Sequence, residues 1–248
     1  MRYSHLKTKL IALFDPQKLD GTLNDEWGFL NESNKDIKKI GYATSLTDDI
    51  VKAAAKNNVD LIITHHDAWH FVYGMKEKCA ELLAKHNIIH AWFHLPLDDA
   101  DFGTSSSIAK ALRLANCKKA NPAGKYLCSV IGEIESPAAF EDFSKGLSDI
   151  LQEPLRAYQN NSSPIHIVCI TGGAGYSTDD IKVALENGCD TYITGEYTLY
   201  AQQYAKLIGI NLLVGSHTNT EILGVHELVS RLSADTDIEY VRLAEDNY

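Results

Sequence analysis

From about residue 39 to the end of the chain, the pattern of apolar and polar positions switches repeatedly between one typical of strands and one typical of helices. Short runs rich in β-branched residues, typical of strands, are separated by amphipathic segments with the period of a helix. This order predicts an α/β protein with a mostly parallel or mixed sheet covered by helices. The predicted strands span residues 39–44, 59–64, 88–93, 126–135, 165–171, 191–194 and 211–215. The predicted helices span 48–57, 75–86, 105–115, 136–151, 179–187 and 199–208, and a last helix ends near 232.

Capping residues mark two of these helix starts. Thr47 precedes Asp48 and Asp49. Its hydroxyl can accept a hydrogen bond from a backbone N–H of the first helical turn, and the two carboxylates complement the helix dipole. Ser136 and Pro137 open the helix that ends near residue 151, because proline is favoured at the first helical position. The clearest break in the first half is Asn121–Lys125, with Pro122 and Gly124. We therefore predict one lobe from residues 1–124 with 215–248, and a second from 125–214.

Composition narrows the class of protein. A chain of 248 residues with 45% hydrophobic residues can bury a core without covalent cross-links. Its five cysteines are odd in number and form no C-x-x-C pair, which indicates core residues in a reducing compartment. The first ten residues carry charge and lack a leader pattern, and no apolar run is long enough to span a bilayer. We expect a cytoplasmic protein without a membrane partner, and the net charge of -10 makes nucleic acid an unlikely partner.

Two adjacent histidines end the second predicted strand. His65 and His66 lie where open α/β sheets gather functional groups, at the carboxyl end of a strand. Neighbouring strand residues face opposite ways, so both rings can serve one site only if the strand breaks here, as Asp67 suggests. The alternative is a pair of surface or capping residues. His94 follows the next strand and is open to three interpretations: a general acid, a partner of the ligands, or a packing residue.

Two carboxylates and a third histidine can join this pair. Asp98 follows a Leu-Pro-Leu turn and is otherwise a turn residue or helix cap. His217 and Glu221 are four residues apart, which places them on one helix face, although solvated helices carry such pairs too. Three imidazoles and two carboxylates together suit zinc, iron or manganese better than calcium or magnesium.

Other features have a structural and a functional interpretation. The turn Gly172–Gly175 before a helix could cradle an anion, but it lacks the Lys-Ser/Thr of a P-loop, which favours a tight structural turn. Trp69, Phe71 and Tyr73 could stack on a planar ring, or serve loop packing or an oligomer contact. Glu196 could orient a bound water or cap the next helix. The remaining histidines are expected to be structural or solvated: His5, His70, His86, His90, His166 and His226.

Four ordered motifs resemble the Nif-three-like family, many of whose members are labelled GTP cyclohydrolase I type 2 homologues. They are Asp60-Leu-Ile-Ile-Thr-His-His66, His94-Leu-Pro-Leu-Asp98, Asp190-Thr-Tyr-Ile-Thr-Gly-Glu196, and His217 with Glu221. The resemblance covers nearly the whole chain and includes Trp27-Gly28 and Gly172-Gly173. It implies two interlocked α/β lobes with mixed sheets flanked by helices, a dinuclear metal site between the lobes, and a homohexamer built as a trimer of dimers.

Matched by motif, the resemblance implies that His65, His66, Asp98, His217 and Glu221 are the metal ligands and that His94 and Glu196 lie beside them as the catalytic residues. The cofactors would be two divalent ions of zinc, iron or manganese. The chain departs from the family pattern at Ser216, where a glycine is common, and at Asp67, where a small residue or proline is common. Neither change removes a ligand.

Two metal ions a few ångströms apart can bind a bridging hydroxide and polarise a carbonyl, phosphoryl or ring carbon. We therefore expect a metal-dependent hydrolase acting on a nucleotide or another small-molecule substrate, with Glu196 or His94 moving protons. Only the family label favours a cyclohydrolase over the hydrolysis of a phosphoester or amide. The alternative is a protein that binds metal without catalysis, as a buffer, an insertase or a regulatory partner.

Overall fold

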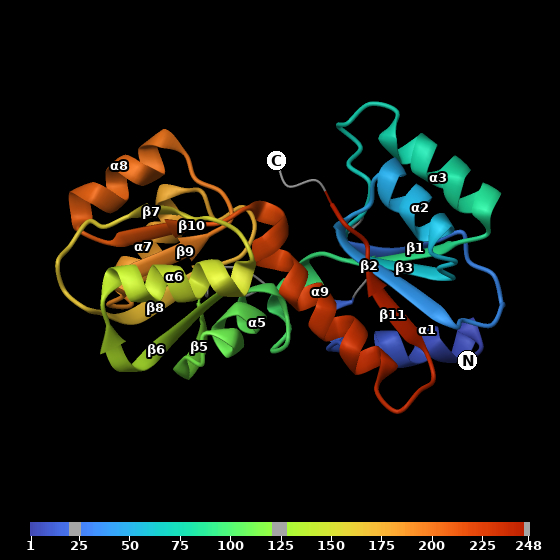
Figure 1. The fold of residues 1–248 in the computed structure, drawn as a ribbon, viewed down its shortest axis with the longest axis horizontal. Helices are drawn as coiled ribbons and strands as arrows, with labels where there is room; N and C mark the ends of the chain where they lie inside the picture. The colour runs from blue at the N-terminus through green and yellow to red at the C-terminus, as the bar shows by residue number, and fades with distance from the viewer. Residues whose placement is uncertain (20–25, 121–127, 246–248) are drawn as a thin grey trace. The chain divides into compact units, whose positions relative to one another are not determined.

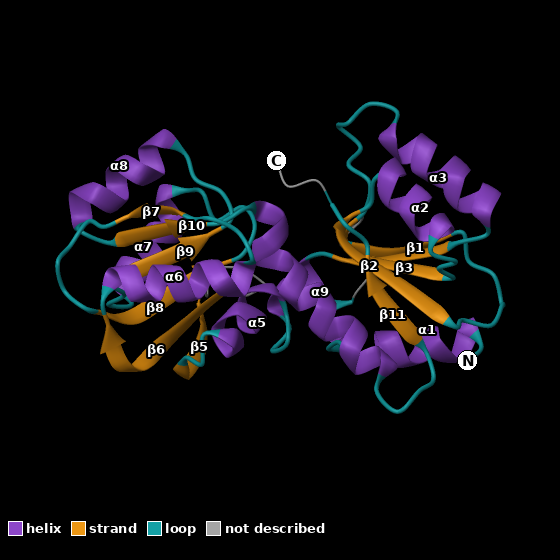
Figure 2. Cartoon of the chain, viewed as in Figure 1, coloured by secondary structure: helices purple, strands orange, loops and turns teal. Residues whose placement is uncertain are grey.

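The computed structural model describes residues 1–19, 26–120 and 128–245. These residues form two compact units. Among the described residues, the first unit takes in 1–102 and 225–245, and the second takes in 103–224. Each unit is an α/β structure with its own sheet, as Figures 1 and 2 show.

The first unit contains a five-stranded sheet in the order β1-β4-β3-β2-β11. Strand β1 runs antiparallel to β4, while β4, β3, β2 and β11 are parallel, so the sheet is mixed. The carboxyl ends of β3 and β4 therefore lie at the same edge. The strands are β1 (Trp27–Leu30), β2 (Lys39–Ser45), β3 (Leu61–His66), β4 (Ile89–Phe93) and β11 (Glu239–Arg242).

Helices cover this first sheet. Val51 of α2 and Leu83 of α3 pack with Ile62 of β3 in one buried cluster, and Figure 1 shows α2 and α3 along one side of the sheet. Helix α2 begins where the sequence predicts, because the Thr47 hydroxyl accepts a hydrogen bond from the Ile50 amide at 3.2 Å. The helices are α1 (Tyr3–Ile11), the 3-10 helix η1 (Pro16–Lys18), α2 (Asp48–Lys56), α3 (Met75–His86) and α4 (Leu95–Asp99).

The second unit contains a six-stranded mixed sheet in the order β5-β6-β8-β9-β10-β7. Its three parallel strands, β8, β9 and β10, are neighbours, and antiparallel strands flank them on both sides. The carboxyl ends of three successive strands thus meet at one edge. The strands are β5 (Ala115–Ala120), β6 (Ser129–Ala138), β7 (Arg156–Tyr158), β8 (Ile165–Thr171), β9 (Thr191–Thr194) and β10 (Asn211–Val214).

Helices cover both faces of the second sheet. Alternation along β9 shows this directly, since Tyr192 packs in the cluster that contains α7 and α8, whereas Ile193 packs in the cluster that contains α5 and α6. Burial on both faces explains why these strands read as continuous apolar runs. The helices are α5 (Thr104–Ala111), α6 (Phe140–Leu151), α7 (Thr178–Glu186) and α8 (Leu199–Ile208), and α9 (His217–Ser233) crosses the division between the units.

The predicted α/β class with mixed sheets and flanking helices is confirmed. The predicted lobe boundaries near residues 124 and 215 stay a prediction, and the break at 121–125 lies outside the described residues. The chain passes from one compact unit to the other at 102/103 and 224/225. The physical reason is α5, because Ile108 and Ala109 pack under the second sheet.

Two predicted helix ends are wrong. The helix predicted over 105–115 stops at Ala111, and β5 starts at Ala115 after Arg113 adopts a left-handed φ of 57°. The helix predicted to open at Ser136 starts at Phe140, because β6 continues to Ala138, which pairs with Ile165 beyond a shift in register. In both places, strand pairing with residues distant in sequence overrides the local preference.

Among the described residues, no helix combines the length and the apolar character that crossing a membrane requires.

Candidate metal centre

The first group of donors lies where β3 and β4 end. His65 and His66 are the last residues of β3, and His94 directly follows β4. Pairing with β2 continues to Ser45 and His66, but the pairing with β4 ends at Thr64 and Trp92. The strand is thus released on one side at the predicted break. The two adjacent rings approach to 4.5 Å between centroids.

Hydrogen bonds fix how these two rings are oriented. The Nδ1 atom of His65 lies 2.9 Å from the carbonyl oxygen of Phe93, which can only accept, so Nδ1 carries the proton of the neutral ring. The lone pair is then on Nε2. The Nδ1 atom of His66 lies 3.0 Å from the hydroxyl of Ser45. A partner thus engages Nδ1 in both rings, and a cation would be bound through Nε2.

Asp98 joins His65 through the short helix α4. Pro96 stands at the start of this helix, and the buried Asp98 places Oδ1 at 3.5 Å from His65 Nε2. A neutral imidazole nitrogen with a lone pair and a carboxylate oxygen are both acceptors. A cation between them satisfies both, which fits a transition-metal site of imidazole and carboxylate ligands.

His94 is held by a carboxylate that the sequence analysis missed. Its Nδ1 atom lies 2.6 Å from Oε2 of Glu26, and its backbone N–H donates to the Glu26 carbonyl at 2.8 Å. The hydrogen bond from His94 is the main reason that the pKa of Glu26 falls below its usual value, against the opposing effect of burial. The antiparallel pairing of Trp27 with Phe93 brings the two residues together. The Trp27-Gly28 motif next to Glu26 was the only signal in the sequence.

The second unit carries the other predicted residues at the carboxyl edge of its parallel strands. Glu196 follows β9, and His217 and Glu221 lie on the first turns of α9, which follows β10. The Nε2 atom of His217 lies 3.2 Å from Oε1 of Glu221, and its Nδ1 lies 2.6 Å from Oε1 of Glu196. Ser216, the departure from the family pattern, accepts a hydrogen bond from the Asn219 amide at 3.1 Å and so caps this helix.

The two carboxylates change the protonation of His217. Burial lowers its pKa, but the hydrogen bond and charge of Glu221, and then those of Glu196, outweigh burial and raise the pKa to about 9. Without a cation the ring is therefore an imidazolium at neutral pH. A metal ion held by His217 Nε2 would take the place of this proton.

The turn Gly172–Gly175 supports the structural interpretation. Two of its amides donate within the unit, Gly172 N–H to Ser105 Oγ at 3.0 Å and Gly173 N–H to Thr220 Oγ1 at 2.9 Å. Gly173 has a left-handed φ of +63°, and a Cβ built there would lie 1.9 Å from Glu221 Oε1 and 3.0 Å from His217 Nε2. The turn thus allows the pair on α9 to approach the backbone closely.

Beside the first group, an aromatic loop follows His66. The ring of Trp69 lies 4.5 Å from that of His66 and stacks on Phe71 at 5.3 Å. Phe71 and Tyr73 are 60% and 97% exposed. The loop therefore offers an apolar surface next to a predicted ligand, and its role as ring stack or contact surface stays open to test.

Asp67 points inward. Its carboxylate is buried and lies 3.0 Å from Lys76 Nζ and 3.8 Å from His90 Nδ1. His90 lies on β4, beside β3. The Thr64 hydroxyl donates to the His66 carbonyl at 2.7 Å, and it therefore accepts a hydrogen bond from His90 Nε2 at 2.8 Å. The expectation that His90 is structural agrees with this position in the core.

His90 is expected to make the protein sensitive to acid. Burial, opposed by Asp67 and reinforced by Lys76, lowers the pKa of His90 from 6.5 to about 4. Between pH 6.5 and about 4, His90 is protonated in the unfolded chain but stays neutral in the folded chain. The free energy of unfolding therefore falls as the pH is lowered through this range, and His90 causes no further loss below it. The full loss is about 3 kcal/mol. Urea unfolding at pH 7 and pH 4.5 measures it. His90→Gln keeps a donor for Thr64 and should remove this part of the pH dependence; an unchanged slope would contradict the assignment.

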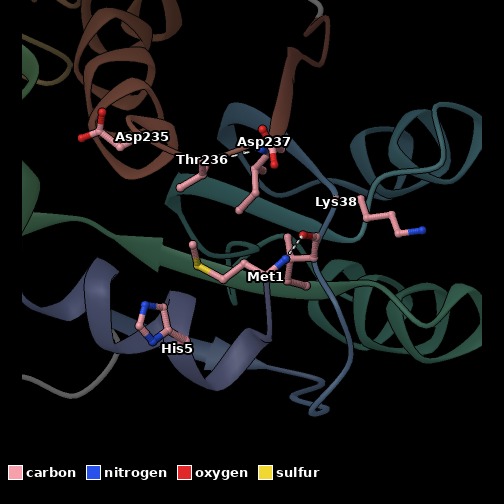
Figure 3. A pocket seen from close by; sticks show the side chains of 8 residues that line it. Met1, His5, Lys38, Asp235, Thr236 and Asp237 are labelled. Carbon is pink, nitrogen blue, oxygen red and sulfur yellow. Dashed lines mark hydrogen bonds between the residues drawn. The ribbon is translucent and has the colours of Figure 1, made fainter.

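A separate hollow of about 530 Å³ in the first unit contains none of the predicted ligands. Figure 3 shows Met1, His5, Lys38 and Asp237 around it. The Met1 nitrogen donates to the Ile37 carbonyl at 3.1 Å there. Its lining includes one histidine, His5, and no group of neighbouring histidines.

Fold and donor groups together define an α/β protein with two mixed sheets and buried histidine and carboxylate side chains of the kind that hold metal ions. The model of the Duf34/NIF3 (NGG1p interacting factor 3) family matches residues 1–247, and the chain belongs to this family. The resemblance inferred from the four motifs is therefore confirmed.

Relatives and solved structures agree with this placement. A Haemophilus influenzae protein named GTP cyclohydrolase 1 type 2 homolog is 30% identical over 224 residues, which cover 86% of this chain and 87% of that protein. The structure of reduced HcgD from Methanocaldococcus jannaschii has a TM-score of 0.83 at 22% identity and covers 99% of this chain and 98% of its own. A Thermus thermophilus structure has a TM-score of 0.84 at 20% identity and covers 100% and 99% of the two chains. At such identities the structural matches establish the fold.

Proposed function

We propose that this protein is a hydrolase that uses two divalent metal ions, with His65, His66, Asp98, His217 and Glu221 as the metal ligands. The orientation of the rings is the observation that carries the proposal. In His65, His66 and His217 a partner engages Nδ1, at 2.9, 3.0 and 2.6 Å respectively, so each ring would bind a cation through its other nitrogen, Nε2. Partners of this kind orient metal-binding histidines and raise their basicity.

When bound, such ions would lower the pKa of water and polarise a carbonyl, phosphoryl or ring carbon. The chain supplies the rest. Asp98 and Glu221 contribute anionic oxygens, and proton transfer falls to one of two side chains beside the ligands, His94 or Glu196. Glu196 holds His217 through one carboxylate oxygen while its side chain is partly exposed, so it can exchange protons with solvent.

The relatives' name suggests a purine nucleotide as substrate, and the aromatic loop at Trp69 and Phe71 offers a surface on which a planar ring can stack. Cyclohydrolase activity is thus the first reaction to assay. Hydrolysis of a phosphoester or an amide is compatible with the same donors. Assembly as a trimer of dimers is also part of the proposal, and sedimentation of the purified chain tests it.

Metal analysis and EPR test the centre. The wild-type chain loaded with Mn²⁺ should bind two ions per chain and give an exchange-coupled spectrum, which only neighbouring ions produce. His65→Ala and His217→Ala should each abolish the coupling, and the double variant should lose both ions. His86→Ala and His166→Ala, exposed histidines of the two units, are the matched controls. Two ions without coupling would show separate sites and would refute the shared centre.

An activity screen on the same set of proteins tests the hydrolase role. GTP, a phosphomonoester and an amide should be compared between wild type and the double variant. Turnover that disappears with the metal supports the proposal. Metal binding without turnover of any of these would instead favour the alternative of a protein that binds metal without catalysis.

A further inference from the structure

Three imidazole rings gather within the first unit, one more than the ligand set uses there. The ring of His94 lies 5.0 Å from that of His65 and 5.1 Å from that of His66. One ring nitrogen from each of the three lies within 4.8 Å of the other two. Three ring nitrogens at this separation have the spacing of three histidine ligands around one cation.

Each of the three rings is held from behind by a different kind of partner. His65 uses the Phe93 carbonyl, His66 the Ser45 hydroxyl, and His94 the Glu26 carboxylate, each at its Nδ1 atom. A carboxylate only accepts, so Nδ1 of His94 carries a proton and the neutral ring presents its Nε2 lone pair. Neutral His94 is therefore prepared to coordinate or accept, and not to donate, at Nε2.

The second unit contains the same arrangement. His217 and Glu196 repeat the distance of 2.6 Å between Nδ1 and a carboxylate oxygen. In both pairs the glutamate is distant in sequence from the histidine: Glu26 directly precedes β1, and Glu196 follows β9. Carboxylate–histidine–metal arrangements recur in metal sites because the carboxylate fixes the tautomer and strengthens the ligand.

We propose that Glu26 makes His94 a metal ligand, so that His65, His66 and His94 form a three-imidazole cation site within the first unit. This inference rests on the proposed function and leaves proton transfer to Glu196. A site of three neutral imidazoles takes a divalent transition metal such as Zn²⁺ or Co²⁺ and discriminates against Mg²⁺ and Ca²⁺. Glu26 is then a positioning residue, since it acts through His94.

Zinc titration of a variant that lacks the donors of the second unit tests the site. The full chain carrying His217→Ala and Glu221→Ala lacks the donors of α9, so Zn²⁺ that it still binds is held elsewhere. We expect one Zn²⁺, with an affinity that falls about 10- to 100-fold on Glu26→Ala and further on His94→Ala. Glu26→Gln retains an acceptor for Nδ1 and should restore part of the affinity. His86→Ala and Glu32→Ala are the controls.

Nitrogen NMR separates coordination from a merely structural role. Long-range ¹H–¹⁵N spectra of the metal-free chain should show His94 protonated at Nδ1, and Zn²⁺ should shift its Nε2 resonance as it shifts that of His65. A Zn²⁺-loaded chain with an unshifted His94 Nε2, or equal affinity in Glu26→Ala, His94→Ala and the controls, overturns the inference. Wild-type chain that binds no Zn²⁺ at all overturns the proposed function instead. Circular dichroism excludes unfolding as the cause of any loss.

Discussion

Gly173→Ala is expected to destabilise the second unit by about 3 kcal/mol or more and to abolish cation binding at His217 and Glu221. Two costs combine at this position. The backbone has a φ of +63°, which a residue with a Cβ rarely adopts, and the new methyl group would stand 1.9 Å from Glu221 Oε1. The glutamate or the turn must move, and the turn is tied to Thr220 of the same helix by the Gly173 amide. Thermal unfolding and Zn²⁺ titration measure the two effects.

Two other glycines of the second unit separate these costs. Gly146 in α6 has neither a positive φ nor an atom within 4 Å of an added Cβ, so Gly146→Ala should be neutral or slightly stabilising. Gly188 has a φ of +75° but open space, so Gly188→Ala should cost only the backbone strain, about 1–2 kcal/mol, and leave cation binding intact. If Gly173→Ala behaves like Gly188→Ala in both measurements, the close approach of Glu221 to the turn is wrong.

Features with local causes were predictable from the sequence. Thr47 caps α2 because its hydroxyl needs only the backbone three residues ahead, and the continuous apolar runs of β3 and β9 follow from burial on both faces. The predicted site positions follow from the same logic, since His65 and His66 end β3 and Glu196 comes two residues after β9. Parallel strands carry residues at their carboxyl ends to a common edge, and sequence order alone gives that placement.

Features that depend on distant pairing were not predictable. Glu26 contacts His94 only because β1 pairs antiparallel with β4. The sequence of a four-residue strand does not indicate which strand it pairs with. The short edge strands β7 and β11 gave no signal for the same reason. At Ser136 the proline signal favoured a helix start, yet pairing with β8 extended the strand to Ala138. Single-residue chemistry identifies candidate ligands, whereas the residues that orient them require the fold.

Glu221→Gln is expected to have the largest effect of any single conservative change among the proposed ligands. Glu221 is buried, contacts His217 Nε2 at 3.2 Å, and contributes more than Glu196 to the raised pKa of that ring. Loss of its charge should lower the pKa of His217 from about 9 by about one unit or more in the metal-free chain. NMR titration of His217 measures this shift without any metal present.

The same variant should also bind Zn²⁺ more weakly. We expect a larger loss of affinity than the factor of about 10 to 100 that is typical when a residue supporting a ligand is changed. A neutral amide replaces an anionic oxygen, so attraction between ligand and cation is lost while the side-chain size is kept. Glu227→Gln is the matched control, because Glu227 lies on the same helix and pairs with Arg231 instead. Elemental analysis and competition with a chelator measure the affinity. A Glu221→Gln chain whose His217 pKa falls while its Zn²⁺ affinity equals that of Glu227→Gln would show that Glu221 sets the protonation of His217 but binds no metal.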